Sequence, residues 1–176
     1  MTFWKFFFNY KNSTKYDKKN ETKTQTLLIK KIRKNNKEEN IYFSTCKTVN
    51  LEKLEQLCDA VGWVRRPLKK VKFALENSFL IISIFYDEGV NQRLIGFARV
   101  TSDGSFNATI WDVVVHPEFQ GNGLGKLLMN EIIKELRKYD ISTITLFADP
   151  EVIKFYKHIG FIIDPDGVKG MFWYPV

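Results

Sequence analysis

The sequence predicts an α+β fold in which helices flank a mixed, mostly antiparallel sheet. Three strand-like runs follow one another in the middle of the chain, and short links of turn-forming residues join them as in hairpins. Amphipathic helical patterns lie on both sides of this block and can cover the sheet. The 176 residues suffice for one ordinary domain, and 15% of them are aromatic, which supplies a substantial core. We expect about six or seven strands and about four helices.

The first elements are one strand and two helices. Residues 41–46 are rich in β-branched and aromatic side chains and predict the first strand. Asn50 is a favoured helix cap, and the apolar positions after it repeat at helical spacing through Val61. Residues 62–67 interrupt the pattern, and residues 71–77 predict a second, shorter helix.

The remaining elements alternate between strands and helices. A helix with one apolar face follows residue 123, and another begins near Pro150 and ends at Gly160, a residue suited to a helix C-terminus. Strands are predicted at residues 79–86, 93–101, 108–115, 142–147, 161–163 and 171–174.

A glycine-rich turn is the most informative feature. The strand that contains Val113, Val114 and Val115 stops at His116-Pro117, and Gln120-Gly-Asn-Gly-Leu-Gly125 then leads directly into a helix. Such a turn directs several free backbone N–H groups and the positive end of the helix dipole at one point. This arrangement predicts an anion site, and a phosphate is the expected anion.

Two common phosphate loops do not fit this turn. A P-loop requires Ser or Thr after Gly-Lys, but Leu127 follows Gly125-Lys126, and Gly121 is one residue too close to serve as the first glycine. A dinucleotide fingerprint requires a third glycine where this chain has Lys126.

What remains is Gln-x-x-Gly-x-Gly at Gln120, Gly123 and Gly125, which resembles the acetyl-coenzyme A pyrophosphate loop of the GNAT superfamily of N-acetyltransferases. Residues 148–161 carry a second motif, because GNAT enzymes have a helix that ends in a similar Phe-Tyr-x-x-x-Gly-Phe and holds a tyrosine near the thioester sulfur. Tyr156 matches that tyrosine. The resemblance covers about residues 41–176 and implies the GNAT fold.

The resemblance implies an acetyl-CoA-dependent N-acetyltransferase whose donor lies on the turn and the strand before it. Backbone N–H groups of the turn would face the pyrophosphate, with side-chain donors from Gln120 and Lys126. The strand would pair with the pantetheine arm, and the N–H of Val113 or Val114 would stabilise the oxyanion. The expected donor-binding residues are Val113, Val114, Val115, Gln120, Gly121, Asn122, Gly123, Leu124, Gly125 and Lys126.

Tyr156 is the expected general acid, because a phenol can protonate a departing thiolate. Two carboxylates are candidates for the general base, Asp149 before the Tyr156 helix and Asp112 at the strand that leads to the turn. We favour Asp149, since its position relative to Tyr156 resembles the plant plastid serotonin and lysine N-acetyltransferases. That group also has a segment similar to residues 62–67, which makes Trp63, Arg65 and Arg66 candidates for the acceptor site.

The net charge of +7 belongs entirely to residues 1–40, whereas residues 41–176 are neutral. We expect residues 1–40 to be a basic, flexible leader and residues 41–176 to be the catalytic domain. The alternative is a leader that docks on a partner, which would make the chain a non-catalytic CoA-binding module. The leader carries no nucleic-acid motif, and the sequence leaves a homodimer possible.

Other features of the sequence bear on metal content and on location in the cell. The two cysteines and two histidines have no zinc spacing, so we expect no metal. The apolar run at residues 1–10 is too short to span a bilayer or to act as a signal peptide. The chain resembles a small GNAT protein encoded in red-algal-type plastid genomes, which implies the plastid stroma, although a bacterial cytoplasmic protein would look similar.

Overall fold

The computed structural model describes residues 26–34, 37–87 and 92–174. The described chain forms two compact units, one that ends at Phe147 and one that begins at Ala148. The first contains the sheet and most of the helices, and the second contains the helix of Tyr156.

A six-stranded mixed sheet forms the first unit, with its strands in sequence order. All neighbours pair antiparallel except the last two, which are parallel. This arrangement confirms the predicted mixed, mostly antiparallel sheet. The strands are β1 (Thr26–Lys34), β2 (Lys37–Ser44), β3 (Leu80–Asp87), β4 (Gln92–Ser102), β5 (Asn107–Val115) and β6 (Thr143–Leu146).

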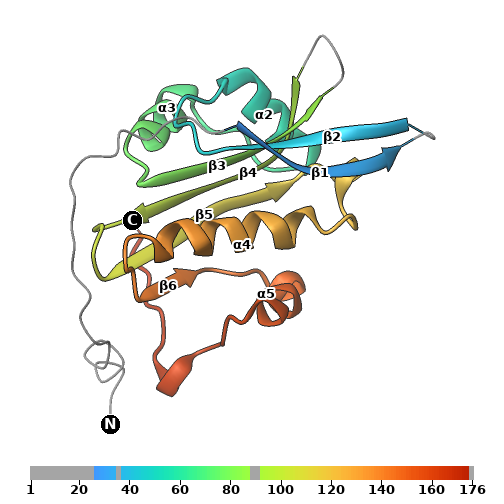
Figure 1. The fold of residues 1–176 in the computed structure, drawn as a ribbon. Coiled ribbons are helices and arrows are strands. Elements are labelled where there is room, and N and C mark those ends of the chain that lie inside the picture. The colour runs from blue at the N-terminus through green and yellow to red at the C-terminus, as the bar shows by residue number, and fades with distance from the viewer. Residues whose placement is uncertain (1–25, 35–36, 88–91, 175–176) are drawn as a thin grey trace. The chain divides into compact units, whose positions relative to one another are not determined.

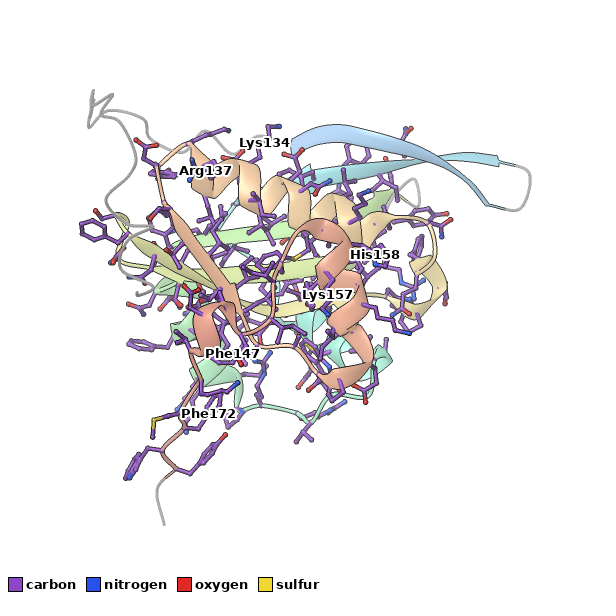
Figure 2. The ribbon with its side chains drawn as sticks, turned by 90° about the horizontal axis from the view of Figure 1, so that it is seen from below. Lys134, Arg137, Phe147, Lys157, His158 and Phe172 are labelled. Carbon is purple, nitrogen blue, oxygen red and sulfur yellow. The ribbon has the colours of Figure 1, made fainter. Side chains whose placement is uncertain are left out.

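Three helices cover the two faces of this sheet. α2 (Leu51–Ala60) and α3 (Leu68–Glu76) lie on one face, and α4 (Leu124–Arg137) lies along the other (Figure 1). The Asn50 side chain accepts a hydrogen bond from the Lys53 N–H, which confirms the predicted cap of α2. Lys134 and Arg137 lie in the last turn of α4, where their charges complement the helix dipole (Figure 2).

Apolar side chains form a core on each face of the sheet. On the α2 and α3 face, Leu54, Leu57 and Leu75 join strand residues that include Phe97 and Val114. Along α4, the residues that point to the sheet are fully buried and recur every three or four positions, as a single helical face requires. They are Leu124, Leu128, Met129, Ile132 and Leu136.

The sheet begins earlier than predicted. β1 and the first residues of β2 fall within residues 1–40, so the predicted leader is wrong for residues 26–34 and 37–40. The prediction gave weight to the lysines, but a segment with β-branched residues such as Ile29 and Ile32 can pair along its backbone whatever its net charge. The leader prediction for residues 1–25 lies outside the described residues.

The second unit contains a 3-10 turn at Pro150–Val152, the helix α5 (Ile153–Ile159) and a 3-10 turn at Pro165–Gly167. The strands predicted at residues 161–163 and 171–174 are not formed, and this part of the prediction is wrong. Asp164 and Asp166 adopt left-handed conformations around Pro165, which interrupts extended backbone. The apolar side chains of these segments, such as Ile162 and Trp173, are exposed.

Candidate active site

The strand before the glycine turn contains a β-bulge. Between its pairs with β4, β5 has one residue more than its partner, because Trp111 and Val114 face Arg99 and Phe97. Asp112 lies in this interval with φ of 54°, in the left-handed region that Asp and Asn tolerate best among residues with a side chain. The bulge therefore consists of Asp112 and Val113, which lie opposite Ala98.

One edge of β5 is free beyond the bulge. β5 pairs with β6 only from Asn107 to Ile110, because β6 ends at Leu146 while β5 continues to Val115. Within the described part of the chain, no strand pairs with that edge after Ile110. An extended ligand arm can add to such an edge through main-chain hydrogen bonds.

The strand register shows which backbone groups face the free edge. The His116 N–H donates to the Ile95 carbonyl at 2.8 Å, and Val114 lies opposite Phe97, so both residues direct their backbone groups toward β4. Because N–H and C=O directions alternate along a strand, those of Val113 and Val115 point the opposite way. The Gln120 Nε2 donates to the Val115 carbonyl at 2.9 Å, in agreement with this direction.

The glycine turn has the conformation that the sequence predicts. Gly121 and Gly123 have φ of 76° and 77°, which a residue with a side chain rarely adopts. Gly123 caps α4, and the first hydrogen bond of the helix runs from Leu127 N to Gly123 O at 3.0 Å. The N–H groups that precede Leu127 in the helix therefore have no helical acceptor.

The surroundings of these N–H groups favour an anion. The first turn of α4 contains no acidic residue and one lysine, Lys126. A Cβ atom built on Gly121 would meet nothing within 4 Å, so the turn is open on that side. The turn thus offers free donors, a positive helix end and space, which fits a pyrophosphate group.

His116 has a structural role at the start of the turn. Its side chain is buried, and its Nδ1 accepts the Glu118 N–H at 3.2 Å, which caps the 3-10 turn at Pro117–Phe119. Its Nε2 lies 2.8 Å from an Arg93 nitrogen. These contacts fix the position of the imidazole ring.

Asp112 is held by two arginines. Its Oδ1 accepts from Arg66 Nη1 at 3.0 Å, and its Oδ2 accepts from Arg99 Nε at 2.6 Å. The side chains of Asp112 and Arg99 are 17% and 18% exposed, so this pair lies mostly out of solvent. Arg99 is a residue that the sequence analysis missed; its only signal is a single charge inside a strand between the buried Ala98 and Val100.

The three predicted acceptor residues separate in the structure. Arg66 reaches the bulge through Asp112, whereas Arg65 pairs with Asp59 at 2.7 Å on the surface. Trp63 is 37% exposed at the same loop. Cys58 lies beside Arg66, and burial raises the pKa of its thiol above the ordinary value, so the thiol remains protonated at neutral pH.

Tyr156 lies on α5 in the second unit. Its ring contacts Phe155 and Phe161 edge-on, at centroid distances of 5.0 and 6.0 Å. Burial, and secondarily the charge of Asp149, raises the pKa of the Tyr156 phenol, which therefore remains neutral at physiological pH.

The two ends of the α5 region are capped differently. Gly160 ends α5 with φ of 106°, as expected. Asp149 precedes a 3-10 turn and makes no side-chain cap hydrogen bond. Lys157 and His158 occupy the last turn, as Figure 2 shows.

The model of the family described as "Acetyltransferase (GNAT) family" matches residues 48–161. The match covers more than half of the chain, from α2 through the bulge and the glycine turn to the end of α5. The chain belongs to the GNAT acetyltransferase family. It is therefore an acyltransferase, as the two motifs predict.

Similar proteins agree with this assignment. An N-acetyltransferase named ycf52 from Gracilaria tenuistipitata var. liui is 59% identical over 181 residues, which cover 100% of both chains. The chloroplastic GCN5-related N-acetyltransferase 2 of Arabidopsis thaliana is 45% identical over 153 residues, which cover 78% of this chain and 59% of that protein. A GNAT-family acetyltransferase structure from Streptococcus pneumoniae aligns with a TM-score of 0.64 at 26% identity and covers 77% of this chain and 98% of that one.

GNAT proteins generally use acetyl-CoA, and two features of this GNAT chain fit that donor: the free edge of β5 and the open turn at Gly121. No group of three or more His, Cys, Asp or Glu side chains suited to a metal occurs among the described residues. Across the same residues, no helix has the length and apolar character needed to cross a bilayer.

Proposed function

We propose that the protein transfers the acetyl group of acetyl-CoA to a primary amine by direct attack of the amine on the thioester. The observation that carries this proposal is the free edge of β5 from the bulge at Asp112 to Val115, which is followed, after the 3-10 turn at Pro117–Phe119, by the open N–H groups of the glycine turn. An extended arm on the edge and a pyrophosphate on the turn together account for both features.

Donor binding falls to the turn and the strand. Backbone N–H groups from Gly121 to Lys126 receive the pyrophosphate, and the Lys126 side chain adds a positive charge. Gln120 acts differently from the expectation, since its Nε2 donates to Val115 O and thereby holds the turn against the strand. Val113 and Val115 supply the backbone groups that pair with the pantetheine arm.

The oxyanion donor follows from the register. The N–H of Val114 points toward Phe97 on β4, whereas that of Val113 points to the free edge. We therefore assign the oxyanion to Val113. A fixed N–H at this position stabilises the negative charge that develops on the thioester oxygen.

In the reaction, the amine nitrogen forms a bond to the thioester carbon, and the carbon–sulfur bond then breaks. The proton of the amine goes to Asp149, directly or through a water molecule, and the thiolate takes a proton from the Tyr156 hydroxyl. Asp149 is preferred to Asp112 because both oxygens of Asp112 already accept hydrogen bonds from arginines.

The acceptor is a protein lysine, a protein N-terminus or an arylalkylamine. Arg66, which contacts Asp112 in the bulge, and Trp63 on the same loop are the proposed acceptor residues, and Arg65 is the more peripheral of the three. The plastid stroma is the proposed location, and its support is the similarity to a chloroplastic relative.

The direct test is calorimetric titration with acetyl-CoA, for the wild type and a Gly123→Glu variant. Gly123 has a positive φ and lies at the open N-terminus of α4, so the variant adds both strain and a carboxylate where the pyrophosphate binds. We expect micromolar binding by the wild type and at least about tenfold weaker binding by the variant. A folded wild type that does not bind acetyl-CoA contradicts the proposal.

A second assay separates an enzyme from a non-catalytic CoA-binding module. The wild type is supplied with acetyl-CoA and lysine peptides, peptides with free N-termini, and arylalkylamines, and free CoA thiol is measured. Turnover with any of these amines identifies the acceptor class. Tight acetyl-CoA binding without turnover on any amine favours the alternative, in which the basic leader docks the module on a partner.

A further inference from the structure

Asp112 joins three parts of the fold at the bulge. Arg66 comes from the loop between α2 and α3, Arg99 comes from β4, and Asp112 itself lies in β5. Arg66 and Asp112 are 46 positions apart in the chain. One carboxylate therefore fixes the loop of the proposed acceptor residues to the strand of the proposed oxyanion donor.

The backbone conformation of Asp112 depends on its contacts with other residues. A left-handed conformation is unfavourable for a residue with a side chain, and it persists where the surrounding contacts hold it. Asp112 has this conformation, and both of its carboxylate oxygens are bound. Val113 is the next residue, so any relaxation of the bulge moves its N–H.

Arg99 anchors the link from the other side. Its guanidinium lies 5.9 Å from the ring centroid of Trp111, and the Trp111 Nε1 donates to Thr101 Oγ1 at 2.9 Å. Arg99 is thus held by Asp112 in the bulge and by Trp111 immediately before it. The Arg66 side chain is 41% exposed, against 18% for Arg99. Because Arg66 belongs to the loop between α2 and α3, a movement of that loop moves Arg66 relative to Asp112.

We propose that Asp112 is a positioning residue, and that its ion pair with Arg66 couples the acceptor loop to the oxyanion N–H of Val113. The proposal rests on the acetyl-transfer function above and extends it. When the loop is seated, Arg66 holds the carboxylate and the bulge is fixed. When the loop moves away, the bulge loses one of its two arginines and the Val113 N–H is less well placed.

The test is a double-mutant cycle of Arg66→Gln and Asp112→Asn. Asparagine tolerates the left-handed conformation as aspartate does, so the second variant removes the charge without forcing the backbone to change. Asp59→Asn is the matched control, because it breaks the neighbouring Arg65–Asp59 pair at the surface and leaves the bulge untouched.

We expect each single variant to lower kcat by about tenfold to a hundredfold, as small misplacements of reacting groups do. The double variant should lower kcat no further than the more severe single variant, because both changes break the same link. The acetyl-CoA Kd should stay within about twofold of the wild type, and the acidic limb of the pH profile should keep its midpoint. Asp59→Asn should keep a kcat closer to that of the wild type than either single variant, because it leaves the Arg66–Asp112 pair intact.

Two kinetic results would overturn the proposal. If the effects of Arg66→Gln and Asp112→Asn multiply, the residues act independently and no link exists. If Asp112→Asn abolishes the acidic limb while Arg66→Gln leaves turnover unchanged, Asp112 is the general base.

Amide hydrogen exchange tests the link without any turnover. Arg66→Gln should speed exchange at Val114, whose N–H points toward β4 beside the bulge, whereas Asp59→Asn should not. Unchanged exchange at Val114 overturns the link whatever the kinetics show. Faster exchange in a protein that acetylates no amine would retain the link and reject the acetyl-transfer function.

Discussion

At the scale of single residues, Tyr156 carries the sharpest catalytic prediction. Removal of its hydroxyl in Tyr156→Phe leaves the ring and its contacts with Phe155 and Phe161 in place. We expect kcat to fall by roughly a hundredfold or more, because the thiolate then leaves without its proton donor. Acetyl-CoA affinity, measured by calorimetry, should change little. Lys154→Gln, at an exposed position of the same helix, is the control and should stay close to wild-type turnover.

The same residue fixes the alkaline side of the pH profile. A general acid acts only while protonated, and the pKa of the Tyr156 phenol lies above its ordinary value of about 10 because of burial and the Asp149 charge. Activity that depends on this proton is therefore present at neutral pH and is lost only as the pH rises above about 10. A limb below about pH 9 that disappears in Tyr156→Phe would contradict the assignment.

At the scale of the element, substitutions at two glycines, Gly96 and Gly121, distinguish a loss of core packing from a loss of ligand binding. Gly96 in β4 has ordinary backbone, but an added Cβ would lie 3.1 Å from Ile84 atoms. Gly121 has φ of 76° and no atom within 4 Å of an added Cβ. We expect Gly96→Ala to lower the free energy of unfolding by about 1–3 kcal/mol through overpacking, with little change in acetyl-CoA affinity once folded.

Gly121→Ala should cost about 1–2 kcal/mol of backbone strain, which the chain can relieve by shifting the turn. Its main effect should therefore be on acetyl-CoA affinity. Urea unfolding and calorimetry on both variants separate the two effects. Equal losses of affinity in the two variants would argue that the turn is not the donor site.

Local signals explain which elements the sequence could predict. The Asn50 cap and the left-handed glycines at Gly123 and Gly160 lie within a few residues of the helix ends that they determine. The hairpin strands around β4 are marked by turn residues and by apolar runs, which are buried along most of β3 and β4. The glycine turn and its helix were therefore predictable in detail.

Non-local contacts explain what the sequence could not predict. β1 forms by pairing with β2, and the lysines in its sequence led to the prediction of a flexible leader instead of a strand. The apolar runs at residues 161–163 and 171–174 lack a strand partner among the described residues, and apolar composition alone does not make a strand. The two arginines that hold Asp112, Arg99 and Arg66, lie 13 and 46 positions away from it in the sequence, too far for a local pattern to indicate the contact.

At the scale of the whole molecule, the donor site and the basic N-terminus are separate features. Every proposed donor-binding residue lies between residues 113 and 126, whereas the net charge belongs to residues 1–40. The sheet itself begins with β1 at Thr26, so residues 1–40 contain both a sheet strand and the chain that precedes it. Two truncations that differ only in β1 can tell the roles of these parts apart.

Removal of residues 1–25 takes away no described strand or helix. We expect this variant to keep the wild-type free energy of unfolding, acetyl-CoA affinity and turnover. Removal of residues 1–34 also removes β1 and leaves β2 as an uncovered edge that can pair with other chains. That variant should unfold at a lower urea concentration and associate in light scattering, while its folded fraction still binds acetyl-CoA. If the shorter truncation alone abolishes turnover but spares acetyl-CoA binding, the basic segment contacts the acceptor, and docking through the N-terminus becomes part of the reaction.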